Sequence, residues 1–474
     1  MNKNTNAKQM KINMLDTPMF TSNKEKMCVY DRELRENIIN LREELKYDIP
    51  STTYLTHAIH NFYPAKFIPQ VPRFVINKFN INGKIILDPF AGSGTTAIES
   101  LITENSNISN DINPITEFFI DVKTLKLNPK NYASYIDNLK HCVDLIFKNN
   151  FKFVPRWENI AYWYPNDILL TLEKIWGGIH NIDEIESSLK KILKVSALYL
   201  SRKYSYGEDD SPKLFKSKQK RLKMKELLNK YHEFGEELLR NELLKKAKQY
   251  LNCIIQFNAS MRTEYIKVES LNNTNKQFLM SINNSIEELG KILTGEKIDC
   301  IITSPPYIYA QEYFRSSKID MYWLNIIDDE NVRKLTRKEI GQKLKPFNDL
   351  NSELLNIKSY KNAIDTVKVF SKNFKTKENI SRFTSYFNDM LYFIQLSEKL
   401  LVKKGILAIF IGEPKVFGYH IKTKDIFSEM MSLNNFKVKY IFFDLIKSRH
   451  LSKNRLNENP SGINGEWLII SEKS

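Results

Sequence analysis

Residues 84–97 read KIILDPFAGSGTTA, and their pattern indicates the fold class. A short run of β-branched and apolar residues leads into a glycine turn, which opens an apolar helical pattern through Ile98 and Leu101. A strand, loop and helix of this kind are typical of a nucleotide-binding α/β unit. Gly92 and Gly94 let the backbone turn sharply and approach a ligand, and the helix N-terminus offers N–H groups and positive potential to a carboxylate.

The next apolar strand, around Ile108, ends at Asp111. A carboxylate at this point is placed to accept hydrogen bonds from ribose hydroxyls. No lysine follows Gly94, which excludes a phosphate-gripping P-loop. The glycine loop and the aspartate alone fit a dinucleotide-dependent dehydrogenase equally well, so a second signal is needed.

That signal is the sequence IDCIITSPPY at residues 298–307, an apolar strand that runs directly into Ser-Pro-Pro-Tyr. The exocyclic amine of a nucleobase is a poor nucleophile because its lone pair is delocalised, so a catalyst that methylates it must accept its N–H hydrogens. Pro305 and Pro306 donate no N–H and hold the chain stiff and extended. Ser304 Oγ and the Pro305 carbonyl are the predicted acceptors, and Tyr307 is predicted to stack on a flipped base.

Together the two segments resemble the amino-group DNA methyltransferases, which use S-adenosylmethionine. Residues 88–96 look like the cofactor motif of that family, and residues 303–307 look like its catalytic motif. Residues 57–69, HAIHNFYPAKFIP, are similar to the segment that closes over the methionine end of the cofactor. Residues 110–114, NDINP, are similar to the ribose-binding turn.

The resemblance implies direct in-line transfer of a methyl group from S-adenosylmethionine to a flipped base. A serine at the first catalytic position implies cytosine N4 as the acceptor, whereas an aspartate or asparagine there is associated with adenine N6. The residues themselves separate the two bases only weakly. The implied catalytic residues are Ser304, Pro305, Pro306 and Tyr307. The implied cofactor contacts are Lys66, Asp88, Phe90, Gly92, Ser93, Gly94, Thr95, Asp111, Ile112, Asn113, Asn284 and Thr303.

The predicted fold is α/β: a Rossmann-like methyltransferase sheet with a terminal antiparallel hairpin, plus a mainly helical insertion. The predicted parts are an N-terminal tail and helix at residues 1–53, the cofactor-binding half of the methyltransferase domain at 54–125, a helical insertion at 126–275, and the catalytic half at 276–474, which itself carries an insertion at about 308–380. The insertion at 126–275 is the leading candidate for target recognition.

The formal net charge of +16 suits a polyanionic partner, although lysine is common throughout the chain. Residues 213–225 contain seven basic residues and no acidic one, and residues 333–338 form a second basic run. Each run could also be a solvated helix face. The predicted DNA contacts are Lys216, Lys218, Lys220, Arg221, Lys223 and Arg315. The expected partners are double-stranded DNA and, acting separately, a cognate restriction endonuclease.

The four cysteines are far apart and form no Cys-x-x-Cys pair, so we expect neither a metal site nor a disulfide framework. No apolar run is long enough to span a bilayer, and the N-terminus lacks the apolar stretch of a signal peptide. The expected location is the cytoplasm, in association with the nucleoid.

Three other functions remain open. An RNA base methyltransferase could share both motifs, because the chemistry is the same. A dehydrogenase would leave residues 304–307 unexplained. A nucleic-acid-binding protein with an inactive core is disfavoured, because the glycine loop and the Ser-Pro-Pro-Tyr turn are both intact.

Overall fold

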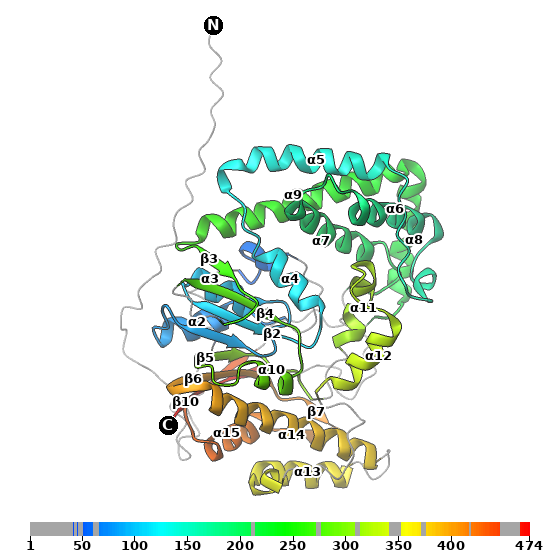
Figure 1. Ribbon diagram of the computed structural model, residues 1–474. Helices are drawn as coiled ribbons and strands as arrows, with labels where there is room; N and C mark the ends of the chain where they lie inside the picture. Colours follow the sequence, from blue (N-terminus) through cyan, green and yellow to red (C-terminus); the bar gives the residue numbers. More distant parts are fainter. Residues whose placement is uncertain are drawn as a thin grey trace.

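The protein is described here from a computed structural model, in which a twisted sheet lies between helical layers and a second, helical body lies beside it (Figure 1). The structure describes residues 41, 45, 51–59, 66–209, 214–271, 276–308, 313–340, 352–370, 376–416, 419–445 and 465–474. Most of the helix expected within residues 1–53 lies outside these ranges, and so does His60 of the segment at residues 57–69.

The large sheet has eight strands in the order β3-β4-β2-β1-β5-β6-β10-β9. In this order, each neighbouring pair of strands from β3 through β4, β2, β1 and β5 to β6 is parallel. Strand β10 lies between β6 and β9 and is antiparallel to both. The strands are β1 (Ile85–Asp88), β2 (Ser106–Asn110), β3 (Tyr265–Lys267), β4 (Gln277–Ile282), β5 (Ile298–Thr303), β6 (Leu401–Gly412), β9 (Phe436–Leu445) and β10 (Gly465–Lys473). A separate two-stranded sheet pairs β7 (Lys415–Val416) with β8 (Tyr419–His420).

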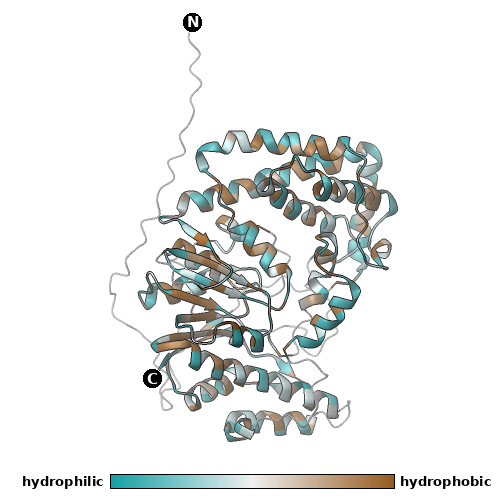
Figure 2. Ribbon diagram, in the orientation of Figure 1, coloured by the Kyte–Doolittle hydropathy of each residue, from teal (hydrophilic) through white to brown (hydrophobic). Residues whose placement is uncertain are grey.

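Apolar side chains cover both faces of the sheet, because successive residues of a strand point to opposite sides. Ile86 and Cys300 pack with Val71 of the helix α2, whereas Leu87 and Ile301 join the core on the other face. The strands are accordingly among the most continuously hydrophobic parts of the ribbon (Figure 2). The helices near the sheet are α2 (Gln70–Lys78), α3 (Thr95–Ile102), α4 (Ile115–Lys123), α10 (Ile286–Ile292), α13 (Lys358–Phe370), α14 (Thr376–Leu400) and α15 (Thr423–Leu433).

Residues 126–267 form a helical body that ends in β3 at the sheet edge (Figure 1). Its helices are α5 (Tyr132–Lys148), α6 (Asn166–Asn181), α7 (Ser187–Lys203), α8 (Lys218–Phe234) and α9 (Glu236–Ser260). Short 3-10 helices are η1 (Leu55–Ala58), η2 (Pro129–Asn131), η3 (Ile160–Trp163) and η5 (Ser352–Asn356).

The helix α11 (Tyr313–Trp323), which follows β5, packs against the helical body. The Trp323 ring stacks on Trp176 of α6 at 5.8 Å between centroids. The Arg202 guanidinium of α7 makes a two-pronged contact with the Asp320 carboxylate, with both N–O distances 2.8 Å. These buried contacts join the segment after residues 304–307 to the helical body.

The predicted fold class is confirmed, including the terminal antiparallel hairpin of β9 and β10. The short edge strand β3 was not expected from the sequence. Residues 330–380, within the predicted insertion at about 308–380, show little periodicity and yet contain α13 and most of α12 (Asp329–Lys338). In the part of the chain that the structure describes, no helix combines the length and the hydrophobicity that crossing a bilayer requires.

Candidate active site

The glycine loop and the Ser-Pro-Pro-Tyr corner leave the same edge of the sheet from neighbouring strands. Strands β1 and β5 pair in parallel, with Ile86 opposite Cys300 and Leu87 opposite Ile301. The Thr303 hydroxyl at the end of β5 donates a hydrogen bond of 2.7 Å to Asp88 Oδ1 at the end of β1. In parallel α/β sheets, ligands bind beyond the carboxyl ends of the strands, so the two motifs share one site.

Asp88 and Thr303, both predicted as cofactor contacts, are buried side chains that connect the motifs. The Asp88 carboxylate also accepts hydrogen bonds from Thr96 Oγ1 at 2.6 Å and from the Phe90 backbone N–H at 3.1 Å. Burial raises the pKa of Asp88 to about 6. The hydrogen bonds from Thr303, Thr96 and Phe90 favour the charged carboxylate and lower the pKa, but burial has the larger effect. These two buried side chains therefore hold the glycine loop against the end of β5.

The raised pKa of Asp88 predicts a pH dependence of folding. An unfolded aspartate titrates near 4, so the folded protein binds the Asp88 proton more tightly between about pH 4 and 6. This contribution to the free energy of unfolding is present at the acidic end of that window, and it is lost as the pH rises through about 6. Urea unfolding measures the free energy of unfolding of the wild type and of Asp88→Asn. The wild-type value minus the variant value should fall by up to about 3 kcal/mol as the pH rises from about 4 to about 6. A difference that is constant or rises with pH would contradict this assignment.

The glycine loop requires left-handed backbone at two positions. Gly92 has a φ of 50° and Gly94 a φ of 79°, and Gly94 is the N-cap of α3. A Cβ atom at Gly94 would lie 2.6 Å from Ile120 Cγ1 of α4, so only glycine fits beneath this helix. The loop is closed by the Gly92 N–H, which donates to Asp111 Oδ2 at 2.8 Å.

The turn after β2 brings Asp111 beside the glycine loop, as predicted. Asp111 Oδ1 accepts the Asn113 N–H at 2.9 Å, and burial raises the pKa of Asp111 to about 6. The Asn113 side chain is buried and donates to Ser317 Oγ of α11 at 3.3 Å, so it faces a helix rather than open space. The Asn284 backbone N–H donates to Asn110 Oδ1, and the Asn284 carbonyl accepts from Asn110 Nδ2. This pair of hydrogen bonds brings the end of β4 to the same edge. Ile112 is half-buried in this turn.

The segment before the cofactor motif is anchored by a buried polar network. Glu99 of α3 contacts His57 Nε2 at 2.7 Å and the Arg73 guanidinium at 2.8 Å, and it accepts a hydrogen bond from the Tyr54 hydroxyl. Burial lowers the pKa of His57 to about 4, so this ring is neutral near pH 7. His57 therefore orients the segment, and the Lys66 ammonium donates to its carbonyl oxygen.

The loop backbone is supported by a lysine that sequence reasoning did not single out. Lys123 of α4 is buried and donates to the Ser93 carbonyl at 2.7 Å. Burial and the nearby Lys66 ammonium hold the pKa of Lys123 well below its usual value, and burial lowers the pKa of Lys66 to about 8. Thr95 Oγ1 donates to the Phe67 carbonyl at 3.0 Å, so two predicted contacts, Ser93 and Thr95, are also held by protein groups. Their surroundings carry positive charge.

The Ser-Pro-Pro-Tyr corner at residues 304–307 is fixed by two side chains, one from a strand and one from a helix that lie far along the chain. The Tyr307 hydroxyl donates to Glu466 Oε1 of β10 at 2.5 Å, and the Tyr386 hydroxyl of α14 donates to the Pro306 carbonyl at 2.9 Å. Among the described residues, neither the Ser304 hydroxyl nor the Pro305 carbonyl has a hydrogen-bond partner. The predicted acceptors are thus available at the corner, while the neighbouring carbonyl is occupied. On the loop side of the site, the predicted contact Phe90 packs edge-on against Phe393 of α14.

The predicted DNA contacts occupy different environments. Lys218, Arg221 and Arg315 are exposed. Lys223 is exposed and lies 2.6 Å from the Asp209 carboxylate. Lys216 lies over the Tyr162 ring, 3.4 Å from its centroid. Lys220 differs from the prediction, because it is buried and forms an ion pair with Asp209.

The comparisons with known proteins agree with this arrangement. A family model for N6/N4 methyltransferases, described as DNA methylase, matches residues 3–117. The Type II methyltransferase M.MvaI of Kocuria varians is 24% identical over 445 residues, which cover 91% of this chain and 92% of that relative. The Type II methyltransferase M.MjaII of Methanocaldococcus jannaschii is 30% identical over 184 residues, 37% of this chain and 34% of the relative. The Type II methyltransferase M.BsoBI of Geobacillus stearothermophilus is 24% identical over 309 residues, which cover 60% of this chain and 56% of that relative. The family-model match and the three relatives together support an amino-group DNA methyltransferase family for this chain.

Proposed function

We propose that the protein transfers a methyl group from S-adenosylmethionine to N4 of cytosine at a specific site in double-stranded DNA. The observation that carries this proposal is the direct contact between the two motifs, in which Thr303 of the catalytic strand donates to Asp88 of the cofactor strand. The relatives named Type II methyltransferases support a role in restriction–modification. The serine at position 304 favours cytosine N4 over adenine N6 by resemblance.

The residues at the sheet edge fit S-adenosylmethionine. When bound, this cofactor supplies an electrophilic methyl group on a cationic sulfur. Asp111 accepts two backbone N–H groups, and a carboxylate has about four acceptor sites, so it retains capacity for ribose hydroxyls. Lys66 and the first N–H groups of α3 would hold the carboxylate at the methionine end, because both present positive potential there. The close packing of Gly94 keeps this loop rigid.

The corner at residues 304–307 supplies the positioning that amine methylation needs. Ser304 Oγ and the Pro305 carbonyl accept the two N–H hydrogens of the amine and orient its nitrogen. The Tyr307 ring stacks on the extruded base and repays part of the cost of unstacking, a few kcal/mol. Holding the two reactants in an aligned geometry accounts for much of the acceleration.

One label-transfer experiment and one thermal-shift experiment test the proposal. Tritiated S-adenosylmethionine is expected to label duplex DNA and not RNA, which separates the DNA enzyme from an RNA methyltransferase. Thermal-shift assays are expected to show stabilisation by S-adenosylhomocysteine and none by NAD, which separates it from a dehydrogenase. Tight DNA binding without label transfer would instead support an inactive core.

The contact between Tyr307 and Glu466 predicts a positioning role for Glu466. Glu466→Ala should lower the turnover number by about 10- to 100-fold, because the base-stacking ring loses its fixed orientation. Tyr307→Phe removes the same hydrogen bond from the other side and keeps the ring. We therefore expect the two single variants to show similar losses and the double variant to show no further loss.

The matched control is Glu466→Gln, which keeps an acceptor oxygen and should retain most of the turnover. Calorimetry with S-adenosylhomocysteine should give the same affinity for all these variants. Losses that add in the double variant, or a Glu466→Ala enzyme with normal turnover, would exclude the positioning role.

A further inference from the structure

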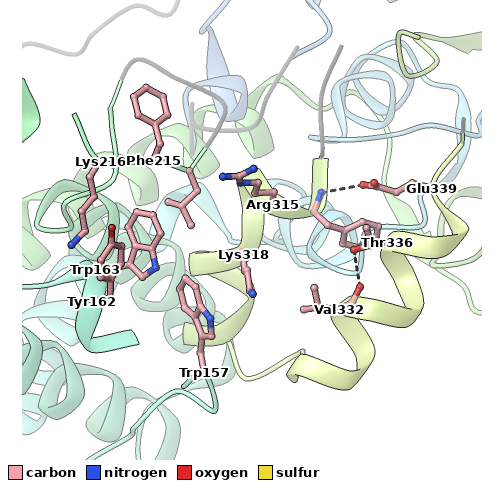
Figure 3. A pocket seen from close by; sticks show the side chains of 12 residues that line it. Trp157, Tyr162, Trp163, Phe215, Lys216, Arg315, Lys318, Val332, Thr336 and Glu339 are labelled. Atoms are coloured by element: carbon pink, nitrogen blue, oxygen red, sulfur yellow. Dashed lines mark hydrogen bonds between the residues drawn. The ribbon is translucent and has the colours of Figure 1, made fainter. Parts of the chain in front are cut away.

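A cavity of about 580 Å³ lies between the helical body and the segment that follows the catalytic corner. Figure 3 shows Trp157, Trp163 and Phe215 on one side and Arg315 and Lys318 of α11 facing them. The helix α12 contributes the far wall through Thr336. This volume is in the range of sites that hold a small ligand or one nucleotide.

The wall on the helical body is aromatic and partly exposed. Tyr162 is 58% exposed and Phe215 is 40% exposed, which is unusual for large rings that line a cavity. Trp157 is buried behind them, between Trp163 and Tyr322, with centroid distances of 6.0 and 5.1 Å. The stack fixes the base of this wall, while the exposed Phe215 ring remains available for contact with a planar group.

The charges around the cavity are mainly positive. The Lys216 ammonium lies 3.4 Å from the centre of the Tyr162 ring, and the described residues provide it with no ion-paired carboxylate. Lys318 lies over the Trp157 ring at 4.8 Å and is 3.8 Å from the Asp329 carboxylate. The one acidic lining residue, Glu339, is 9% exposed and accepts the Phe314 N–H at 3.2 Å. A ligand here meets flat rings and ammonium groups, which matches a base and its phosphates.

The cavity lies close to the catalytic corner along the chain. Phe314, which lines it, is seven residues after Tyr307, a separation that spans at most about 25 Å. Phosphates of one DNA strand follow one another every ~3.4 Å along the duplex axis, so a nucleotide in the cavity would belong to a stretch within about seven nucleotides of the target.

We infer that this cavity binds a second unstacked nucleotide of the DNA, near the methylated base, with the base against Phe215 and the flanking phosphates on Lys216 and Lys318. This inference rests on the proposed function, because it takes DNA as the substrate. It joins the two insertions into one DNA-contacting surface, in place of recognition by the insertion at 126–275 alone.

The test compares matched variants of the full chain in binding to a duplex that carries the methylated sequence. Phe215→Ala and Lys216→Gln should each weaken binding by about tenfold, the loss expected for one stacked base or one lost phosphate contact. The controls are Phe234→Ala and Lys130→Gln, which remove an exposed phenylalanine and an exposed lysine elsewhere in the helical body. Both controls should bind as the wild type does.

A set of duplexes with one abasic nucleotide at successive positions then locates the base. At one position other than the target, the effect of Phe215→Ala should disappear, because the ring no longer has a base to contact. Wild-type affinity of the cavity variants overturns the inference, and so does a Phe215→Ala effect that is equal at every abasic position. If the wild type itself neither binds nor methylates DNA, the proposed function fails, and that result is distinct from either of these.

Discussion

Tyr307→Ala is expected to lower methyl transfer by about 100-fold or more while leaving S-adenosylhomocysteine affinity within about twofold. The ring is the predicted platform for the flipped base, and its hydroxyl is held by Glu466 on β10. Its loss removes the stacking surface and the alignment of the amine together. Single-turnover transfer of a tritiated methyl group to DNA measures the chemical step, and calorimetry measures cofactor binding.

Pro305→Ala serves as the companion variant at the same corner. Alanine restores a backbone N–H donor and loosens the chain beside Ser304, so transfer should fall to a similar extent. The control is Tyr132→Ala, which removes a 38% exposed tyrosine at the start of α5. Normal single-turnover rates in either corner variant would remove the catalytic assignment of residues 304–307.

Gly94→Ala should destabilise the protein by about 2 to 5 kcal/mol and weaken cofactor binding with it. Two effects combine at this position. An alanine must adopt a φ of 79°, and its Cβ atom would lie 2.6 Å from Ile120 Cγ1. Relief of this clash must move α4 or the loop, and Lys123 of α4 supports the Ser93 carbonyl. Chemical unfolding and calorimetry with S-adenosylhomocysteine measure the two losses.

Gly295→Ala separates backbone strain from the clash. Gly295 has a φ of 87°, and nothing lies within 4 Å of a Cβ atom built there. This variant should lose about 1 to 2 kcal/mol of stability, which is what left-handed backbone costs an alanine, and keep normal cofactor affinity. Equal losses in the two variants would show that the packing against Ile120 is unimportant.

The fold and the meeting of the two motifs were predictable because both signals are local. Each motif combines an apolar strand with a turn, and the carboxyl ends of parallel strands meet at one edge of a sheet. The strand pairing of β1 with β5 then brings Asp88 next to Thr303. Both side chains were predicted as cofactor contacts, and the structure shows in addition that each is buried at the end of its strand.

Contacts that depend on tertiary packing were not predictable. Glu466 is 159 residues from Tyr307, and their meeting depends on the insertion of β10 beside β6. Within the basic run, helical periodicity could have identified Lys220 as an inner residue, because it lies four positions before Met224 and both are buried on α8. The positive charge of residues 213–225 led instead to the prediction that Lys220 is exposed and contacts DNA.

Two residues that line the cavity, Lys216 and Arg315, were predicted as DNA contacts, but the cavity itself was not predictable, for a similar reason. Its aromatic wall comes from a stretch without periodicity around Trp157 and from Phe215, and its basic side chains come partly from α11. Only the packing of α11 on the helical body, through Arg202 and Asp320, brings these groups together.

Modification-sensitive sequencing of DNA from cells that express the protein is the sharpest test of site-specific cytosine N4 methylation, because it reports the base, the atom and the site together. We predict N4-methylcytosine at one short sequence, absent from cells that express the Tyr307→Ala variant. N6-methyladenine at such a sequence would keep the amino-group chemistry and correct the base. Unmodified DNA, or methylation only at a ring carbon, would contradict the account, because the donor-free corner serves an amine alone.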